Sequence, residues 1–148
     1  MSVLVRQATI EDLEQLAPMF DSYRQFCRKN ADVDLAHAFL RERLQRQESL
    51  ILVAGLSRQL VGFTQLFPSF SSADAGRTFI LGDLFVAPEA RREGVATALV
   101  AEAMKVARAH GAVSLSLSTA RANVQAQTLY ESLGWKQDDF FYHYNFAL

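Results

Sequence analysis

The stretch FVAPEARREGVATAL (residues 85–99) decides the fold, because it joins the end of a strand to the start of a helix through a turn at Gly94. A helix start leaves several backbone N–H groups without partners, and these groups carry the positive end of the helix dipole. Phosphate docks there readily, and Gly94 has no Cβ to keep a ligand away from the backbone. Arg91 and Arg92 add positive charge at the rim. The stretch therefore predicts a phosphate-binding turn, with an ordinary solvated turn as the alternative.

Two common phosphate-binding loops do not match this stretch. The loop of GTP- and ATP-binding proteins ends in Gly-Lys-Ser/Thr, and that ending is missing here. The glycine loop of dinucleotide-binding folds follows the first strand, whereas this stretch follows the fourth strand that we expect along the chain. A nucleotide-binding protein is therefore a minor alternative.

The rest of the chain alternates between short strands and amphipathic helices. Thr9 and Asp12 form a capping pair that predicts a helix start at Ile10, and Pro18 should kink or split that helix. Gly111 is a natural end for the helix that follows the turn. The expected strands cover residues 2–8, 49–55, 59–67, 77–86, 113–118, 135–137 and 140–148; the expected helices lie between residues 10 and 27, around 36–44, and over 94–111 and 122–134.

This order, β-α-α-β-β-β-α-β-α-β-β, predicts an α/β fold of the mixed α+β kind. A hairpin-rich first half followed by strand–helix–strand units implies one mixed, mostly antiparallel sheet with helices on both faces. No linker-like composition interrupts residues 1–148, so we expect a single domain.

Composition narrows the possible partners. The net charge of −1 gives no global attraction to nucleic acid or to an anionic membrane, and no apolar run approaches the length of a membrane span. The first residues have no basic segment followed by an apolar run, so no signal peptide is expected. The single cysteine, Cys27, excludes an intramolecular disulfide and fits a cytoplasmic location. The histidines have no metal-ligand spacing, so no metal is expected.

Two segments together resemble the GNAT superfamily of acyl-CoA-dependent N-acetyltransferases. ARREGVATAL (90–99) is similar to that family's acyl-CoA signature, Arg/Gln-x-x-Gly-x-Gly/Ala, at Arg91, Gly94 and Ala96. NVQAQTLYESLGW (123–135) is similar to its second signature, and the matching residues are Asn123, Ala126, Leu129, Tyr130, Gly134 and Trp135. The order of elements is also that family's order, so the resemblance covers nearly the whole chain.

The resemblance implies acetyl-CoA as cosubstrate. Backbone amides at the turn would hold the pyrophosphate, and the backbone of Phe85 and Val86 would pair with the pantetheine arm. Asn123 and Tyr130 would lie near the arm and the sulfur. The cofactor-binding residues implied are Phe85, Val86, Arg91, Arg92, Glu93, Gly94, Val95, Ala96, Thr97, Asn123, Ala126 and Tyr130.

Acetyl transfer to an amine suggests roles for two side chains. A phenol keeps its proton at neutral pH, so Tyr130 could protonate the leaving thiolate, and the Val86 amide could stabilise the oxyanion. Asp83 lies within an apolar strand, where a carboxylate is costly unless paired or used. We expect it to bind the substrate ammonium and to remove its proton, directly or through water, from the side of the strand shared with Leu81 and Phe85.

Each role has a structural alternative. Tyr130 could be a packed helix aromatic, and Asp83 could form a salt bridge to an arginine or a hydrogen bond to a loop. LGDLFV (81–86) resembles the acidic strand of the polyamine and protein-amine enzymes of the family. Gly82 stands where those enzymes often have an acid, which weakens the case for a polyamine acceptor.

Three aromatic residues, Tyr23, Phe26 and Phe67, could line the acceptor pocket or simply belong to the core or its rim. The aromatic last strand could pack internally or across a dimer, and the resemblance suggests a homodimer. The leading hypothesis is an acetyl-CoA-dependent N-acetyltransferase that acts on a primary amine through a ternary complex. The alternative is a non-catalytic CoA-binding module that serves as a sensor or partner domain. The acceptor remains open among small amines, amino acids, peptide N-termini and protein lysines.

Overall fold

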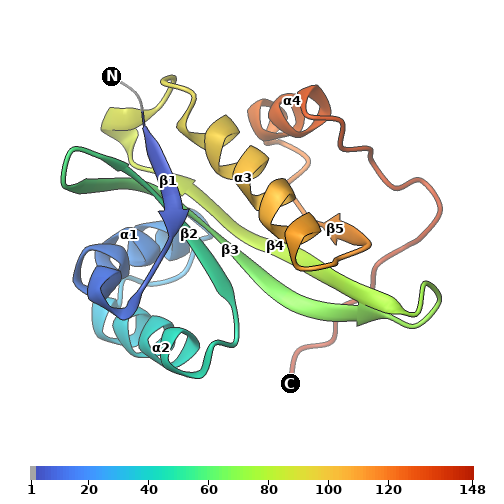
Figure 1. The fold of residues 1–148 in the computed structure, drawn as a ribbon, viewed down its shortest axis with the longest axis horizontal. Helices are drawn as coiled ribbons and strands as arrows, with labels where there is room; N and C mark the ends of the chain where they lie inside the picture. The colour runs from blue at the N-terminus through green and yellow to red at the C-terminus, as the bar shows by residue number, and fades with distance from the viewer. Residues whose placement is uncertain (1–2) are drawn as a thin grey trace. The chain divides into compact units, whose positions relative to one another are not determined.

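The computed structural model describes residues 3–148 and contains one five-stranded sheet. Its strands lie side by side in chain order (Figure 1). The first four strands pair antiparallel and the fifth pairs parallel with the fourth, which confirms the mixed, mostly antiparallel sheet. The strands are β1 (Leu4–Gln7), β2 (Leu50–Leu56), β3 (Gln59–Ser71), β4 (Gly76–Val86) and β5 (Ser114–Ser116).

Helices cover both faces of the sheet, as the element order predicts (Figure 1). The short helix η1 (Ile10–Asp12), α1 (Leu13–Phe26) and α2 (Val33–Arg46) lie on one face, and α3 (Val95–Ala109) lies on the other, after the single turn η2 (Pro88–Ala90). Neighbouring residues of β3 point to opposite faces of the sheet and so contact different helices. Gly62 faces α3, where an added Cβ would lie 3.1 Å from Val95, whereas Phe63 packs against Phe20 of α1.

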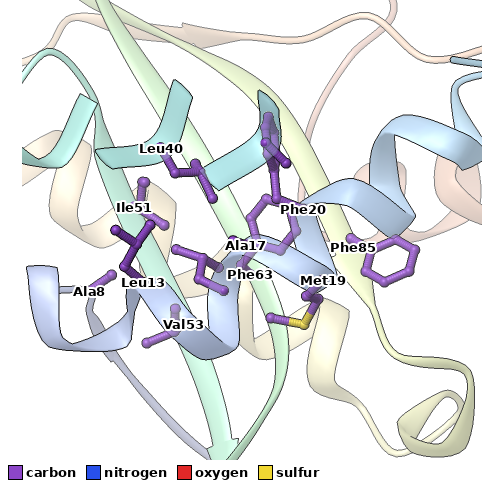
Figure 2. Packing of buried hydrophobic residues seen from close by; sticks show 12 residues of the cluster. Ala8, Leu13, Ala17, Met19, Phe20, Leu40, Ile51, Val53, Phe63 and Phe85 are labelled. Carbon is purple, nitrogen blue, oxygen red and sulfur yellow. The ribbon is translucent and has the colours of Figure 1, made fainter. Parts of the chain in front are cut away.

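The core between α1, α2 and the sheet is aromatic at its centre. Figure 2 shows Phe20, Phe63 and Leu40 packed between helix and strand, with Ile51 and Val53 from β2 beside them. The rings of Phe20 and Phe63 meet edge to face with centroids 6.1 Å apart. These contacts hold α1 against β3 and β4, where the functional side chains lie.

Pro18 does not split α1, although a split was one of the two expected effects. The helix starts beside Ile10 as predicted, but it runs without a break from Leu13 to Phe26. The proline removes one main-chain hydrogen bond near the helix start, and the helix packs through residues on either side of it. Packing of the buried face therefore outweighs the loss of that bond.

A bulge in β4 changes the direction of its side chains. Asp83 pairs with Gln65 and Leu81 pairs with Leu66, which leaves Gly82 as an extra residue on β4. Because Gln65 and Leu66 are neighbours, they point to opposite faces of the sheet. The expectation that Asp83 shares a face with Leu81 is therefore wrong, while Phe85, paired with Phe63, does lie on the Asp83 face.

Several predicted boundaries move. The hairpin of β3 and β4 extends through residues expected as a loop, and β5 is shorter than the predicted strand 113–118. The first strand was expected from residue 2, which lies outside the described residues. The predicted end of the third helix is confirmed, since Gly111 has φ of +77° just after α3. No helix between residues 3 and 148 is both long and apolar enough to cross a lipid bilayer.

Residues 119–148 form a second compact unit, separate from the unit that ends at Ser118. It contains α4 (Val124–Ser132), within the predicted helix. The closing strands predicted at residues 135–137 and 140–148 are not formed. Alternation along the sequence marks a segment that could pair, but a strand exists only with a partner for its hydrogen bonds, and the aromatic side chains of Tyr142, Tyr144 and Phe146 stay exposed.

Asp12 ties the end of β1 to the first helix. Its carboxylate accepts two hydrogen bonds from the Arg6 guanidinium, at 2.7 and 2.8 Å, and one from the Thr9 amide at 2.8 Å. The Arg6 hydrogen bond is the main reason that the pKa of Asp12 lies below its usual value, and the Thr9 amide adds to it, although burial acts in the opposite direction. A carboxylate with a lowered pKa stabilises the fold above its unfolded pKa of about 4, and this stabilisation is lost as the pH falls.

We therefore expect Asp12→Asn to reduce the free energy of unfolding at pH 7 by about 1–3 kcal/mol, because it breaks charged hydrogen bonds. The gap between variant and unaltered protein should shrink as the pH falls from 5 to 3. Urea unfolding followed by circular dichroism at both pH values measures it. Glu11→Gln, at an exposed acid in the same turn, is the control; a gap that is independent of pH would contradict the role of the Asp12 charge.

Candidate functional site

The turn before α3 has the geometry of an anion site. Gly94 is the residue before the helix and has φ of +79°, in the left-handed region, and Arg92 also has a positive φ of +65°. The amides of Val95, Ala96 and Thr97 open the helix, where no preceding turn can supply acceptors. A Cβ at Gly94 would meet no atom within 4 Å, so the requirement for glycine there comes from the backbone angle and from access to the amides.

Arg91 is exposed and also contacts β4. Its Nε donates a hydrogen bond to the carbonyl of Val86 at 3.0 Å, and its guanidinium lies 5.7 Å from the centre of the Phe85 ring. These contacts fix the segment between the strand and the turn. Arg92, Glu93 and Gly94 remain exposed at the turn itself.

The outer edge of β4 is open beyond the short β5. Among the described residues, β5 pairs with Thr78–Ile80 only. The Ala87 amide donates to the Val61 carbonyl at 2.8 Å, so by alternation the main-chain groups of Phe85 face β3 and those of Leu84 and Val86 face outward. The register therefore favours Leu84 and Val86 over Phe85 for pairing with an extended ligand along this edge.

Asp83 is buried with hydrogen bonds to the neighbouring strand. Its side chain and main chain together are 9% exposed. Gln65 Nε2 donates to Asp83 Oδ2 at 2.5 Å, and Thr64 Oγ1 donates to the Asp83 carbonyl at 2.7 Å. The partners are thus strand residues, and none of the ion pairs within residues 3–148 involves Asp83. The salt-bridge alternative is not what the structure contains.

Burial dominates the electrostatics of this carboxylate. It raises the pKa of Asp83 above its usual value, while the hydrogen bonds from Gln65 and Tyr23 act in the opposite direction. The Tyr23 hydroxyl lies 3.1 Å from the Gly82 carbonyl, and its single proton can serve either that carbonyl or the Asp83 carboxylate. Burial and the Asp83 charge raise the pKa of Tyr23, so the phenol stays protonated. A carboxyl group with a raised pKa is suited to take up a proton near neutral pH.

Aromatic rings border Asp83 on the α1 face. The Tyr23 ring packs edge to face against Phe63 and Phe85, with centroids 5.9 and 6.5 Å apart. The Phe67 ring lies over Gly82, where an added Cβ would come within 2.6 and 2.8 Å of its atoms. Phe67 therefore occupies the space that an acidic side chain at position 82 would need.

The structure brings together three of the four predicted acceptor-pocket residues. Tyr23, Phe67 and Asp83 all lie around Gly82. Phe26 is the last residue of α1, and its side chain is 63% exposed. The arrangement offers one carboxylate beside aromatic rings, which suits a cation carried on an apolar group.

Two polar residues that lie beside Asp83 were not identified from the sequence. Gln65 and Thr64 interrupt the apolar run of β3, and both are fully buried. A buried polar group needs a partner, so their position within an apolar strand could have marked them. Ser49, whose hydroxyl donates to Gln65 Oε1 at 2.6 Å, carries no comparable signal because it precedes β2.

In the C-terminal unit, the predicted residues lie on α4. Asn123 caps this helix, and its Oδ1 accepts a hydrogen bond from the Ala126 amide at 3.2 Å. Tyr130 is buried, and burial raises the pKa of its hydroxyl. Its ring lies 5.7 Å from that of Trp135. A neutral phenol of this kind can donate a proton or a hydrogen bond at neutral pH.

No group of three or more His, Cys, Asp or Glu side chains within residues 3–148 is arranged to hold a metal ion. The site as described consists of an anion-binding turn, an open strand edge leading from it, and a buried carboxylate beside that edge, all within the first unit. This combination is suited to an extended phosphorylated ligand and a basic second ligand.

Comparison with known proteins accounts for this combination. The model of the acetyltransferase (GNAT) family matches residues 13–135. The chain is 44% identical over 140 residues to the uncharacterised N-acetyltransferase YhfO of Bacillus subtilis, which covers 95% of this chain and 94% of that protein. The crystal structure of a probable acetyltransferase is 41% identical, with a TM-score of 0.91 over 100% of this chain and 98% of the other.

A more distant likeness extends to the fold. An aminoglycoside N-acetyltransferase in complex with CoA has a TM-score of 0.83 at 20% identity, over 99% of this chain and 96% of that one. The family model, the relative of nearly equal length and the arrangement of turn, strand edge and carboxylate agree with one another. The chain therefore belongs to the GNAT family of acetyltransferases.

Proposed function

We propose that the protein moves an acetyl group from acetyl-CoA to a primary amine, by direct attack within a ternary complex. The observation that carries this proposal is the buried Asp83 carboxylate, whose pKa is raised, on the strand whose outer edge leads to the α3 turn. Such a group can take the proton that an ammonium must lose before it attacks. Membership of the acetyltransferase family supports the reaction class.

For the donor, the proposal assigns the pyrophosphate of CoA to the amides between Arg92 and Thr97. The pantetheine arm would pair with the open edge at Leu84 and Val86. Asn123, Ala126 and Tyr130 would lie along the arm and near its sulfur. The CoA complex of the aminoglycoside N-acetyltransferase, which shares this fold, supports the choice of donor.

For the acceptor, the proposal assigns the ammonium to Asp83, between the rings of Tyr23 and Phe67. One carboxylate and a ring over Gly82 fit a single cationic amine better than a polyamine, whose further charges would need further acids. Phe26 would border the entrance. Small amines, amino acids, peptide N-termini and protein lysines all satisfy this chemistry, and we expect no nucleic-acid or membrane partner.

The reaction follows with every proton assigned. Asp83 takes a proton from the ammonium, directly or through a water, and the neutral nitrogen attacks the thioester carbonyl. The Val86 amide, which faces the open edge, stabilises the oxyanion. As the C–S bond breaks, Tyr130 donates its proton to the sulfur. The nitrogen, which gained a positive charge on attack, gives its second proton to the Tyr130 phenolate, directly or through a water, and Asp83 releases its proton to solvent. Free CoA and the N-acetylated product then leave.

The alternative is a CoA-binding sensor or partner module without catalysis. A module that only holds the cofactor would gain nothing from burying a carboxylate whose ionisation is disfavoured, so Asp83 favours the enzyme. Calorimetry with acetyl-CoA, ATP and NAD separates both from a nucleotide-binding protein. The lone Cys27 is compatible with the reducing cytoplasm, which we propose as the location.

Replacing Tyr130 tests the proposed acid. We expect Tyr130→Phe to lower kcat by about 10²-fold or more, because the thiolate loses its proton donor, with CoA affinity changed by less than about threefold. Thiol release during amine acetylation gives kcat, and calorimetry gives the affinity. Tyr142→Phe, at a side chain that is 92% exposed, is the control. An unchanged rate in Tyr130→Phe would remove this residue as the acid.

Replacing Asp83 separates catalysis from stability. We expect Asp83→Asn to lower kcat/KM by about 10²–10⁴-fold, with partial recovery at high pH, where the amine loses its proton unaided. Because the folded pKa is raised, ionisation of Asp83 destabilises the fold as the pH rises above the unfolded value, so the variant should be at least as stable at pH 7. The dependence of kcat/KM on pH measures the effect on catalysis, and urea unfolding measures the effect on stability. A variant that is inactive because it unfolds would contradict this assignment.

The exposed aromatic tail supports a homodimer. Phe140, Tyr142, Tyr144 and Phe146 are 88–92% exposed, which is unusual for such large apolar side chains. We expect light scattering to give twice the 16.5 kDa mass of one chain, and the double change Tyr142→Asp with Tyr144→Asp to halve it. Glu11→Gln serves as a surface control. A monomeric mass for the unaltered protein refutes the dimer.

A further inference from the structure

We propose that Gln65, itself held by Ser49, is a positioning residue that fixes the Asp83 carboxylate so that Oδ1 meets the amine of the acceptor. The inference rests on the proposed function, in which Asp83 acts on an amine. It concerns two side chains that do not touch the reacting atoms. Its basis is a row of two hydrogen bonds, which runs from the residue before β2 to β3 and from β3 to β4.

The first step is the orientation of the Gln65 amide. An ionised carboxylate can only accept hydrogen bonds, so the amide must turn its Nε2 toward Asp83, where the distance to Oδ2 is 2.5 Å. Its Oε1 then faces Ser49, whose hydroxyl donates to it at 2.6 Å. Since Gln65 is 0% exposed, water does not compete for these groups. Ser49 therefore selects the amide orientation that suits the carboxylate.

The second step is the effect on Asp83. Gln65 engages Oδ2, and the Tyr23 hydroxyl can donate to the Gly82 carbonyl instead of to the carboxylate. Oδ1 is then the oxygen that meets the acceptor's ammonium. Thr64 holds the carbonyl of the same residue at 2.7 Å, so both the main chain and the side chain of Asp83 are tied to β3. Only the Gln65 hydrogen bond acts on the carboxylate itself, and this bond keeps the carboxylate in the one geometry that proton transfer to it requires.

The third step is electrostatic. Burial raises the pKa of Asp83, and the Gln65 hydrogen bond is the largest of the influences that oppose it. Without Gln65, burial would act with less opposition and Asp83 would stay protonated to a higher pH. A protonated Asp83 cannot accept the amine's proton, so the loss appears as a displaced acidic limb in the pH–rate profile.

Two substitutions test the proposal. Gln65→Met keeps the length of the side chain and removes both hydrogen bonds, and Ser49→Ala removes only the bond that orients the amide. We expect the acidic limb of kcat/KM to move to higher pH in Gln65→Met, with about a tenfold loss of rate on that limb for each pH unit of displacement. Ser49→Ala should displace the acidic limb less than Gln65→Met does. Ser49→Thr, which keeps a hydroxyl, should leave the limb where it is in the unaltered protein. The affinity for CoA should not change.

Thr64→Val is the matched control, since it removes a buried hydrogen bond to the same residue but to its main chain. Thr64→Val should lower the free energy of unfolding and leave the acidic limb of the pH–rate profile unchanged. Titration of the Asp83 carboxyl by ¹³C NMR, assigned with Asp83→Asn, follows the same displacement without any turnover.

The possible outcomes separate the two proposals. The positioning role is overturned if Gln65→Met and Ser49→Ala change neither the acidic limb of the pH–rate profile nor the titration of the Asp83 carboxyl. The proposed amine acetylation is unaffected by that result. Equal displacement by Thr64→Val also overturns the positioning role, because the effect would then be general loosening of the strand pair. If the unaltered protein acetylates no amine, the proposed function fails, and the carboxyl titration still decides whether Gln65 acts on Asp83.

Discussion

Burial of the Asp83 carboxylate between β3, β4 and α1 is the constraint on which the arrangement of the site depends. A buried charge costs several kcal/mol unless hydrogen bonds replace the water that it loses. Here β3 provides the Gln65 amide and α1 provides the Tyr23 hydroxyl. The compensation is incomplete, because the pKa of Asp83 remains raised. The fold thus keeps the Asp83 carboxylate in a state from which protonation is more favourable than in water.

The two faces of the sheet position different parts of the site. On the α1 side, Phe20, Phe63 and Tyr23 form a continuous aromatic contact that fixes the distance between helix and strand, and Asp83 lies at its end. On the other side, α3 packs closely on Gly62, where almost no space remains for a side chain. The start of α3 is therefore held relative to the end of β4, which is what a ligand bound to both requires.

Much of this arrangement can be read from sequence because it depends on local patterns. The helix start near Ile10, the turn at Gly94 and the mixed sheet follow from capping residues, glycine and alternation. The Gly82 bulge could not be predicted, because it depends on the register between two strands and not on either strand alone. The prediction of closing strands at residues 135–137 and 140–148 was wrong for the same reason. Alternating aromatic residues indicate that a segment could form a strand, but they do not show which strand it would pair with. Gln65 was missed because a single polar residue in an apolar strand has many explanations until its neighbour is known.

The contact between Phe67 and Gly82 also bears on how this site can change over generations. A side chain at position 82 would overlap the Phe67 ring, so an acid introduced there must displace that ring unless residue 67 is already smaller. The reverse order is open, since a smaller residue at 67 leaves only a gap. A second acidic group beside Asp83 is therefore easier to accommodate after residue 67 has become smaller than before. The Phe67 ring that lies beside Asp83 thus also disfavours a second negative charge at position 82.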